Sequence, residues 1–145
     1  MTTIEEVTAL ARSEQFLAIV STVRADGTLQ SSLVNAGFML HPVSGETVLA
    51  FVTYGPAKLG NLRVRPQITV AFRSGWQWAS VEGRAEIIGP HDPHGSVDAE
   101  QLRQVLRDVF TAAGGTHDDW DAYDRTMVDE GRSAVFVTPT RIYSN

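Results

Sequence analysis

Residues 53–72 read TYGPAKLGNLRVRPQITVAF, and this stretch determines how the chain is organised around it. The branched and apolar run Thr47–Thr53 predicts a strand, which a glycine–proline pair then breaks. Ala57–Val64 fits two turns of helix, and Pro66 ends it because proline lacks the backbone N–H that a helix interior requires. The alternation of apolar residues in Gln67–Arg73 predicts a second strand. The stretch is therefore a strand, a short helix and a strand.

Further strands are expected on both sides of this stretch. Asp26-Gly27 favours a tight hairpin turn because both residues tolerate positive φ. Gly83 is expected to bend or bulge the strand that contains it. The remaining expected strands are Phe16–Val23, Leu29–Phe38, Trp76–Ile88 and a last strand formed by Ser133–Val137 and Arg141–Tyr143 around Pro139.

Three more helices are expected outside the strands. Thr3–Gln15 has acidic residues in its first turn and an apolar stripe at helical spacing. Val97–Ala113 has the most regular amphipathic pattern of the chain, and two glycines follow it. Asp118–Asp129 places Trp120 and Met127 among its apolar positions.

The pattern predicts a mainly β, α+β fold. About six strands joined mostly by short hairpins favour an antiparallel sheet that closes into a β-barrel with peripheral helices. At 145 residues the chain is expected to form a single domain, residues 1–145.

Composition excludes several kinds of function. A net charge of −5 argues against nucleic-acid binding, which needs a basic surface. The absence of cysteine excludes disulfides, thiolate metal sites and cysteine nucleophiles. Of the four histidines, His91 and His94 have a spacing that suggests a metal site, but no second cluster complements them and a loop is preferred, so no metal is expected. No apolar run is long enough to span a membrane, and a cytoplasmic protein is expected.

The short helix after Thr53 is a candidate anion site. Free N–H groups at its start, together with Lys58 in its first turn, favour binding of a phosphate. Asn61 lies one turn further on the same face, and Arg63 or Arg65 is available to assist. The alternative is that these side chains form the solvent-facing side of a surface helix.

Two segments carry a resemblance to a known family. One is the helix segment of residues 53–66, and the other is His117-Asp118-Asp119-Trp120-Asp121-Ala122-Tyr123, followed by Met127. Together they resemble the pyridoxamine 5'-phosphate oxidase-like split barrels of the FMN-binding type, over nearly the whole chain. More narrowly they are similar to the actinobacterial oxidoreductases that use flavin or the deazaflavin coenzyme F-420. The resemblance implies a six-stranded split barrel that forms a homodimer with the cofactor site at the subunit interface.

The resemblance also implies a set of cofactor-binding positions. Lys58 and Asn61 would bind phosphate, and the cofactor ring would lie against two middle strands. Trp76 and Trp78 are expected to share one strand face and to reach toward the neighbouring subunit's cofactor, or else to pack in the dimer core. The ring positions are Gln30, Ser32, Val34 and Asn35 on one strand and Val52 and Thr53 on the next.

The implied function is hydride transfer between coenzyme F-420 and a small organic substrate. Such chemistry belongs to the cofactor, and no catalytic protein acid or base is identified. Relatives often carry basic residues at the positions of Pro56 and Gly60. Because this chain lacks them, its anion site is less cationic than the sites of those relatives. FMN is therefore the alternative cofactor. A carrier that binds the cofactor without turnover and a dimer that has lost its site are further alternatives.

Overall fold

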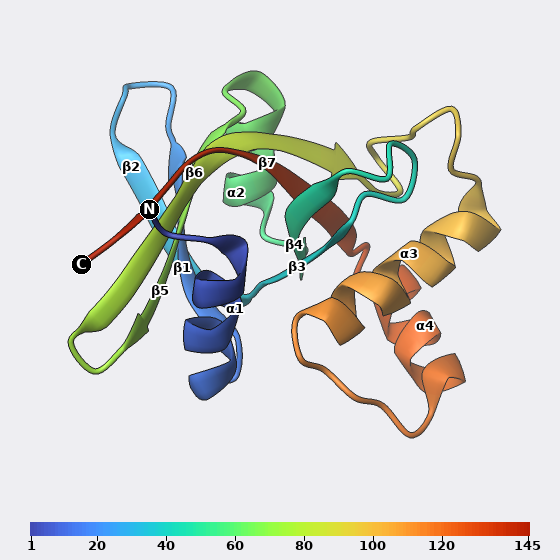
Figure 1. Cartoon of the computed structure of the whole chain (residues 1–145). Helices are drawn as coiled ribbons and strands as arrows, with labels where there is room; N and C mark the ends of the chain where they lie inside the picture. Colours follow the sequence, from blue (N-terminus) through green and yellow to red (C-terminus); the bar gives the residue numbers. More distant parts are fainter.

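The computed structural model describes residues 1–145 and contains one seven-stranded antiparallel sheet with four helices around it (Figure 1). The spatial strand order is β2-β1-β5-β6-β7-β4-β3. The strands are β1 (Leu17–Val23), β2 (Leu29–Asn35), β3 (Gly37–Leu40), β4 (Thr47–Thr53), β5 (Gln67–Ser74), β6 (Gln77–Ile88) and β7 (Ser133–Ser144). The helices are α1 (Ile4–Ser13), α2 (Pro56–Val64), α3 (Ala99–Ala112) and α4 (Trp120–Asp129).

The two edge strands of the sheet are consecutive in sequence. β2 and β3 lie at opposite ends of the strand order, although only Ala36 separates them. The sheet must therefore curl until its edges meet, which is the closure of a split barrel. The expected fold class is confirmed.

The strand count is seven rather than the expected six. Leu29–Phe38 is divided at Ala36, which is fully buried and donates its N–H to the Phe16 carbonyl at 2.9 Å. The two halves then pair with different neighbours, β2 with β1 and β3 with β4. The change of pairing partner at Ala36 thus splits a segment that reads as one strand in sequence.

The last strand is continuous through Pro139. This residue lies opposite Gly83, where the β6–β7 register shifts, so the predicted bulge is confirmed. The bulge accommodates a residue without a backbone N–H. A Cβ at Gly83 would lie 2.3 Å from the Thr138 carbonyl oxygen, which explains why only glycine fits there.

Strand β4 is buried on both faces and separates two hydrophobic clusters. Leu49 and Phe51 point into the barrel, where they pack with residues of α1 and α2. Val48 and Ala50 point to the other side, where α3 and α4 cover the sheet. Residues that alternate along β4 therefore face two different environments, because successive side chains in a strand point to opposite faces.

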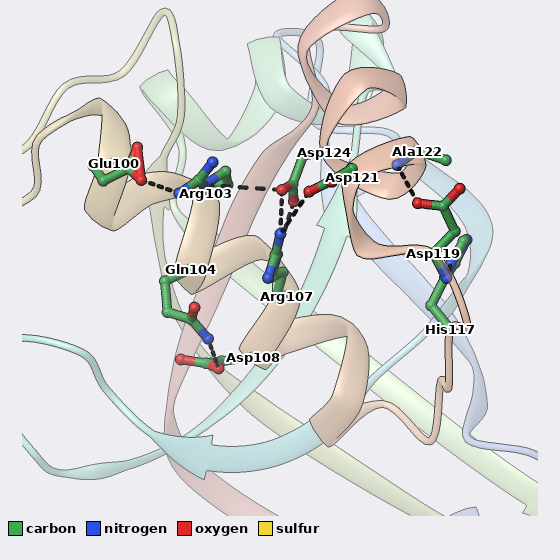
Figure 2. A network of polar contacts seen from close by, with 10 residues as sticks. All are labelled: Glu100, Arg103, Gln104, Arg107, Asp108, His117, Asp119, Asp121, Ala122 and Asp124. Carbon is green, nitrogen blue, oxygen red and sulfur yellow. Dashed lines mark hydrogen bonds and ion pairs between the residues drawn. The ribbon is translucent and has the colours of Figure 1, made fainter.

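Helices α3 and α4 are tied together by polar contacts. Arg107 makes a bidentate ion pair with Asp124 (Figure 2). The Tyr123 hydroxyl donates to the Leu106 carbonyl at 2.8 Å. Both helices begin two residues later than the sequence pattern indicates, because Asp98 and Asp119 serve as N-caps. None of the four helices combines the length and the apolar character needed to cross a lipid bilayer.

Candidate functional site

Lys58 lies in the first turn of α2 and is only 6 % exposed. Its Nζ donates to Thr53 Oγ1 at 3.2 Å and lies 5.9 Å from the centre of the Phe51 ring. The Gly55 N–H donates to the same Thr53 oxygen at 3.3 Å. The end of β4 and the start of α2 are thus held together around this one ammonium group. The alternative of a solvent-facing lysine is wrong.

No carboxylate compensates the charge of Lys58. Burial lowers the pKa of its ammonium group, and no acidic neighbour opposes this effect. Burying an unpaired ammonium group costs several kcal/mol in general, which is why buried charges in proteins are paired or bind a ligand. Lys58 is also the only lysine of the chain. Lys58 is therefore a buried cation without an anionic partner in this chain, an environment that suits an anionic ligand.

A chain of hydrogen bonds continues from α2 into the barrel. Asn61 Nδ2 donates to Thr22 Oγ1 at 3.1 Å, and Thr22 Oγ1 donates to Gln30 Oε1 at 3.2 Å. Thr22 is completely buried. The Gln30 carbonyl is therefore occupied, and its amide N–H groups remain available to a ligand. Sequence reasoning identified Asn61 and Gln30 but missed Thr22, whose only signal is its pairing opposite Gln30 in the β1–β2 hairpin.

Ser32 and Val34 lie on the same face of β2 as Gln30. The Ser32 Oγ is buried and has no hydrogen-bond partner. Val34 packs in the hydrophobic cluster inside the barrel. An unpartnered buried hydroxyl costs roughly 1–3 kcal/mol, so its presence near other free donors marks a place where a ligand group fits.

We name the group formed by Thr22, Gln30, Ser32, Thr53, Lys58 and Asn61 the α2 cluster. Its side chains point inward from β1, β2 and β4 and from the inner face of α2. It holds five of the ten residues that the sequence singles out.

Asn35 and Val52 lie on the opposite side of the sheet from the α2 cluster. Both line a hollow of about 570 Å³ between the sheet and helices α3 and α4. Asn35 Nδ2 donates to the Gln15 carbonyl at 2.9 Å. Because Val52 and Thr53 are neighbours in a strand, their side chains point to opposite faces of the sheet.

Trp76 and Trp78 are remote from both places. Trp76 is 94 % exposed and lies in the turn before β6, so the two residues do not share a strand face as expected. Trp78 pairs with Arg73, whereas Thr22 pairs with Ile68 at the other end of β5. Five residues of strand span roughly 17 Å. Within one chain the tryptophans therefore do not meet the α2 cluster.

The two arginines at the C-terminal end of α2, Arg63 and Arg65, have other partners. Arg63 makes a bidentate ion pair with Asp92 at 2.7 and 2.8 Å, which raises the pKa of its guanidinium group. Arg65 Nε donates to the Val23 carbonyl at 2.8 Å. Both tie α2 to neighbouring loops, which leaves Lys58 as the cation of the cluster.

No group of three or more histidine, cysteine, aspartate or glutamate side chains is arranged to hold a metal ion. His41 accepts N–H groups from Val43 and Ser44 and pairs with Glu86, and His94 accepts from Ser96. These histidines organise turns.

The α2 cluster fits an anionic cofactor. It offers a desolvated ammonium group, free amide donors and an unpartnered hydroxyl, and it has no acidic member. Such a set recognises a phosphate or a polar ring edge rather than a cation. Neither Pro56 nor Gly60 adds charge, and the position of Gly60 opens to free space.

Solved structures with this fold include proteins of several kinds. A conserved hypothetical protein from Mycobacterium tuberculosis matches at 19 % identity and a TM-score of 0.68, over 99 % of this chain and 84 % of that one. An F-420 reductase matches at 18 % identity and a TM-score of 0.57, over 89 % and 90 %. A pyridoxamine 5'-phosphate oxidase-related, FMN binding protein from Nostoc punctiforme matches at 12 % identity and a TM-score of 0.63, over 99 % and 86 %. At these identities the likeness is one of fold.

The sequence itself matches a family model. The model described as pyridoxamine 5'-phosphate oxidase aligns with residues 4–144, which is nearly the whole chain and includes every member of the α2 cluster. The family resemblance that residues 53–66 and 117–123 carry is thereby confirmed. The chain belongs to the pyridoxamine 5'-phosphate oxidase family of split barrels.

Proposed function

We propose that this protein is an oxidoreductase that binds coenzyme F-420 through the α2 cluster and reduces a small organic substrate. The observation that carries the proposal is the buried Lys58 ammonium group without a carboxylate partner. When bound, a reduced deazaflavin supplies a hydride to an electron-poor atom of the substrate, and water supplies the proton. The F-420 reductase of the same fold supports this cofactor class.

Residues of the α2 cluster perform the binding. Lys58 and the first-turn N–H groups of α2 hold a phosphate, since a helix N-terminus with a cation is an anion site. Gln30 donates its free amide N–H groups, and Ser32 Oγ gains the partner that it lacks. Phe51 and the barrel core beneath exclude water from one side of the site. No residue of the cluster is positioned as an acid or base.

FMN is the second candidate cofactor. One phosphate would satisfy a site whose only free cation is Lys58, because Arg63 and Arg65 have other partners. The FMN binding protein from Nostoc punctiforme has the same fold. A carrier that binds either cofactor without turnover uses the same residues, and oxidation of the reduced cofactor by a panel of acceptors separates an enzyme from a carrier.

The site is proposed to be completed by a second copy of the chain. The outer face of β1 and β2 exposes Leu17, Ile19, Leu29 and Leu33, and Trp78 of β6 is exposed as well. Contiguous exposed apolar side chains of this kind mark interaction surfaces. In a homodimer, the Trp76–Trp78 hairpin of one subunit would be free to approach the cofactor of the other.

The direct test is a fluorescence titration of coenzyme F-420, repeated with FMN, into the wild-type protein and Lys58→Met. Methionine keeps the length and removes the charge, so the affinity should fall at least tenfold, about 1.4 kcal/mol. Urea unfolding of the cofactor-free variant should show unchanged or higher stability, because replacing an unpaired buried charge with an apolar side chain removes a desolvation cost.

Arg63→Ala is the matched control on the same helix. Its ion pair with Asp92 is partly exposed, so its loss should leave cofactor affinity within about twofold. If the protein binds FMN more tightly than F-420, then FMN is the cofactor and the proposed binding site stays the same. If neither cofactor binds the wild-type protein, or if Lys58→Met binds as tightly as the wild type, the proposal is wrong.

A further inference from the structure

The hollow of about 570 Å³ on the helical side of the sheet contains two unused hydrogen-bond donors. Arg132, just before β7, lines it, and the Arg132 Nε is buried without a hydrogen-bond partner. Its Nη2 bonds Glu130 at 3.2 Å, and its guanidinium carbon lies 4.0 Å from the centre of the Tyr54 ring. The stacking and the ion pair hold the guanidinium group in place, and its Nε–H remains free.

His117 supplies the second donor. Its Nδ1 accepts the Asp119 N–H at 3.0 Å, so Nδ1 carries no proton in the neutral ring (Figure 2). The ring proton then resides on Nε2, which makes no hydrogen bond with the protein. His117 is packed against Phe110, Trp120 and Tyr123, with ring centres 5.8 to 6.3 Å away, and this packing fixes its orientation.

The hollow is lined by basic and neutral side chains, with acidic partners outside it. Glu130 pairs with Arg132, and Asp118 Oδ1 lies 3.8 Å from His117 Nδ1. No aspartate or glutamate is among the residues that line it, in a chain whose net charge is −5. Its remaining wall is apolar and aromatic, with Val52 from the sheet, Phe110 from α3 and Met127 from α4. The neighbouring hollow of about 490 Å³ shares Arg132 but is also lined by Asp98 and Asp124, so acidic side chains face its interior.

The wall of the hollow includes strained backbone. Gln15 has φ 59° and the following Phe16 has φ 60°, a left-handed conformation that is costly for residues with side chains. The strained turn directs the Gln15 carbonyl to Asn35 Nδ2, and both residues line the hollow. A Cβ at Gly114 would lie 2.5 Å from the Phe16 ring, so the glycine at the end of α3 is required for this arrangement.

We propose that this hollow binds a small organic acid, with its carboxylate on Arg132 Nε and His117 Nε2 and an apolar or aromatic body against Val52, Phe110 and Met127. A volume of about 570 Å³ is suited to a small molecule. Val52 and Asn35 lie on the opposite side of the sheet from the α2 cluster, so this acid site is separate from the proposed cofactor site and does not rest on the function proposed above.

The test is a binding titration of the cofactor-free protein with phenylacetate, followed by ¹H–¹⁵N NMR. Wild-type protein should bind phenylacetate with shifts at Val52, Gly115 and Arg132, and phenylacetamide at least tenfold more weakly because it lacks the charge. Arg132→Gln should weaken phenylacetate binding at least tenfold. Arg125→Gln, which removes an exposed arginine from the same region, should leave it unchanged. Val52→Trp should block the hollow without removing any charge.

Two outcomes overturn the proposal. One is the absence of phenylacetate binding to the wild-type protein. The other is binding that survives Arg132→Gln and Val52→Trp but is lost in Lys58→Met, which would place the acid in the α2 cluster. Since the titration contains no cofactor, its failure leaves the cofactor proposal intact, and failure of cofactor binding leaves this result intact.

Discussion

At the scale of single residues, Lys58 combines burial with the absence of a counter-ion. Its ammonium group bonds only Thr53, and burial lowers its pKa below the ordinary value of 10.5. Between the folded and unfolded pKa values the unfolded chain holds the proton and the folded chain does not. Unfolding therefore takes up a proton in that window, and the free energy of unfolding rises with pH there. Below the folded pKa the desolvation cost is fully present.

The lowered pKa of Lys58 also predicts how anion binding depends on pH. Affinity for F-420 or FMN should fall as pH rises through the lowered pKa of Lys58, because the anion binds the charged form. The pKa can be read directly from ¹³C-labelled lysine, since the chain contains only one. Lys58→Arg should keep its affinity at high pH, because an arginine stays charged. A wild-type affinity that stays constant up to pH 10.5 would contradict this prediction.

At the scale of elements, α2 presents an uncharged position that faces open space. Gly60 lies within the helix, and a Cβ built there meets no atom within 4 Å. Gly60→Lys should therefore fit without strain and tighten binding of the polyanionic F-420 by up to about fivefold, consistent with one added exposed charge pair worth up to about 1 kcal/mol. Fluorescence titration measures the change at low ionic strength.

Gly60→Ala separates charge from helix stability. Alanine should raise the stability of α2 by about 0.5–1 kcal/mol, as lysine also does, but should leave cofactor affinity unchanged. The two variants should therefore share a higher urea midpoint and differ in affinity. Equal affinities of both variants would show that the cofactor's anionic part does not extend along this side of α2.

At the scale of the whole molecule, the outer barrel face carries the exposed apolar residues that support the dimer proposal. Ile19 and Leu33 pair across β1 and β2 and are 46 % and 60 % exposed. A lone apolar residue on a surface is ordinary, but several on adjacent strands favour a partner. The α2 cluster and the Trp76–Trp78 hairpin lie far apart in one chain, so they can meet only across two chains.

Leu33→Glu should convert the proposed dimer into a monomer, because it places a charge in the centre of an apolar interface. Light scattering after size-exclusion chromatography measures the mass, and cofactor affinity should fall together with it. Val128→Glu, at an apolar residue of α4 that is 79 % exposed, is the control and should leave the mass unchanged. A wild-type protein that is monomeric at all concentrations would overturn the dimer proposal.

The elements whose cause is local were predictable from sequence. The Asp26-Gly27 turn, the Gly83 bulge and the strand–helix–strand order around Lys58 follow from residue type and spacing. The division of Leu29–Phe38 at Ala36 was not predictable, because its cause is the change of partner from β1 to β4, which depends on how the sheet closes.

The sequence by itself determined the family and the antiparallel barrel, and it singled out Lys58 and Asn61 as candidate site residues, because motifs and alternation are local properties of the chain. Only the tertiary structure decided that Thr22 joins Asn61 to Gln30, that Val52 and Thr53 serve opposite faces, and that Arg63 is occupied by Asp92. It also brought Arg132 and His117 to one hollow. The physical reason is that barrel closure joins residues far apart in sequence, and their pairing depends on register and burial rather than on their own identity.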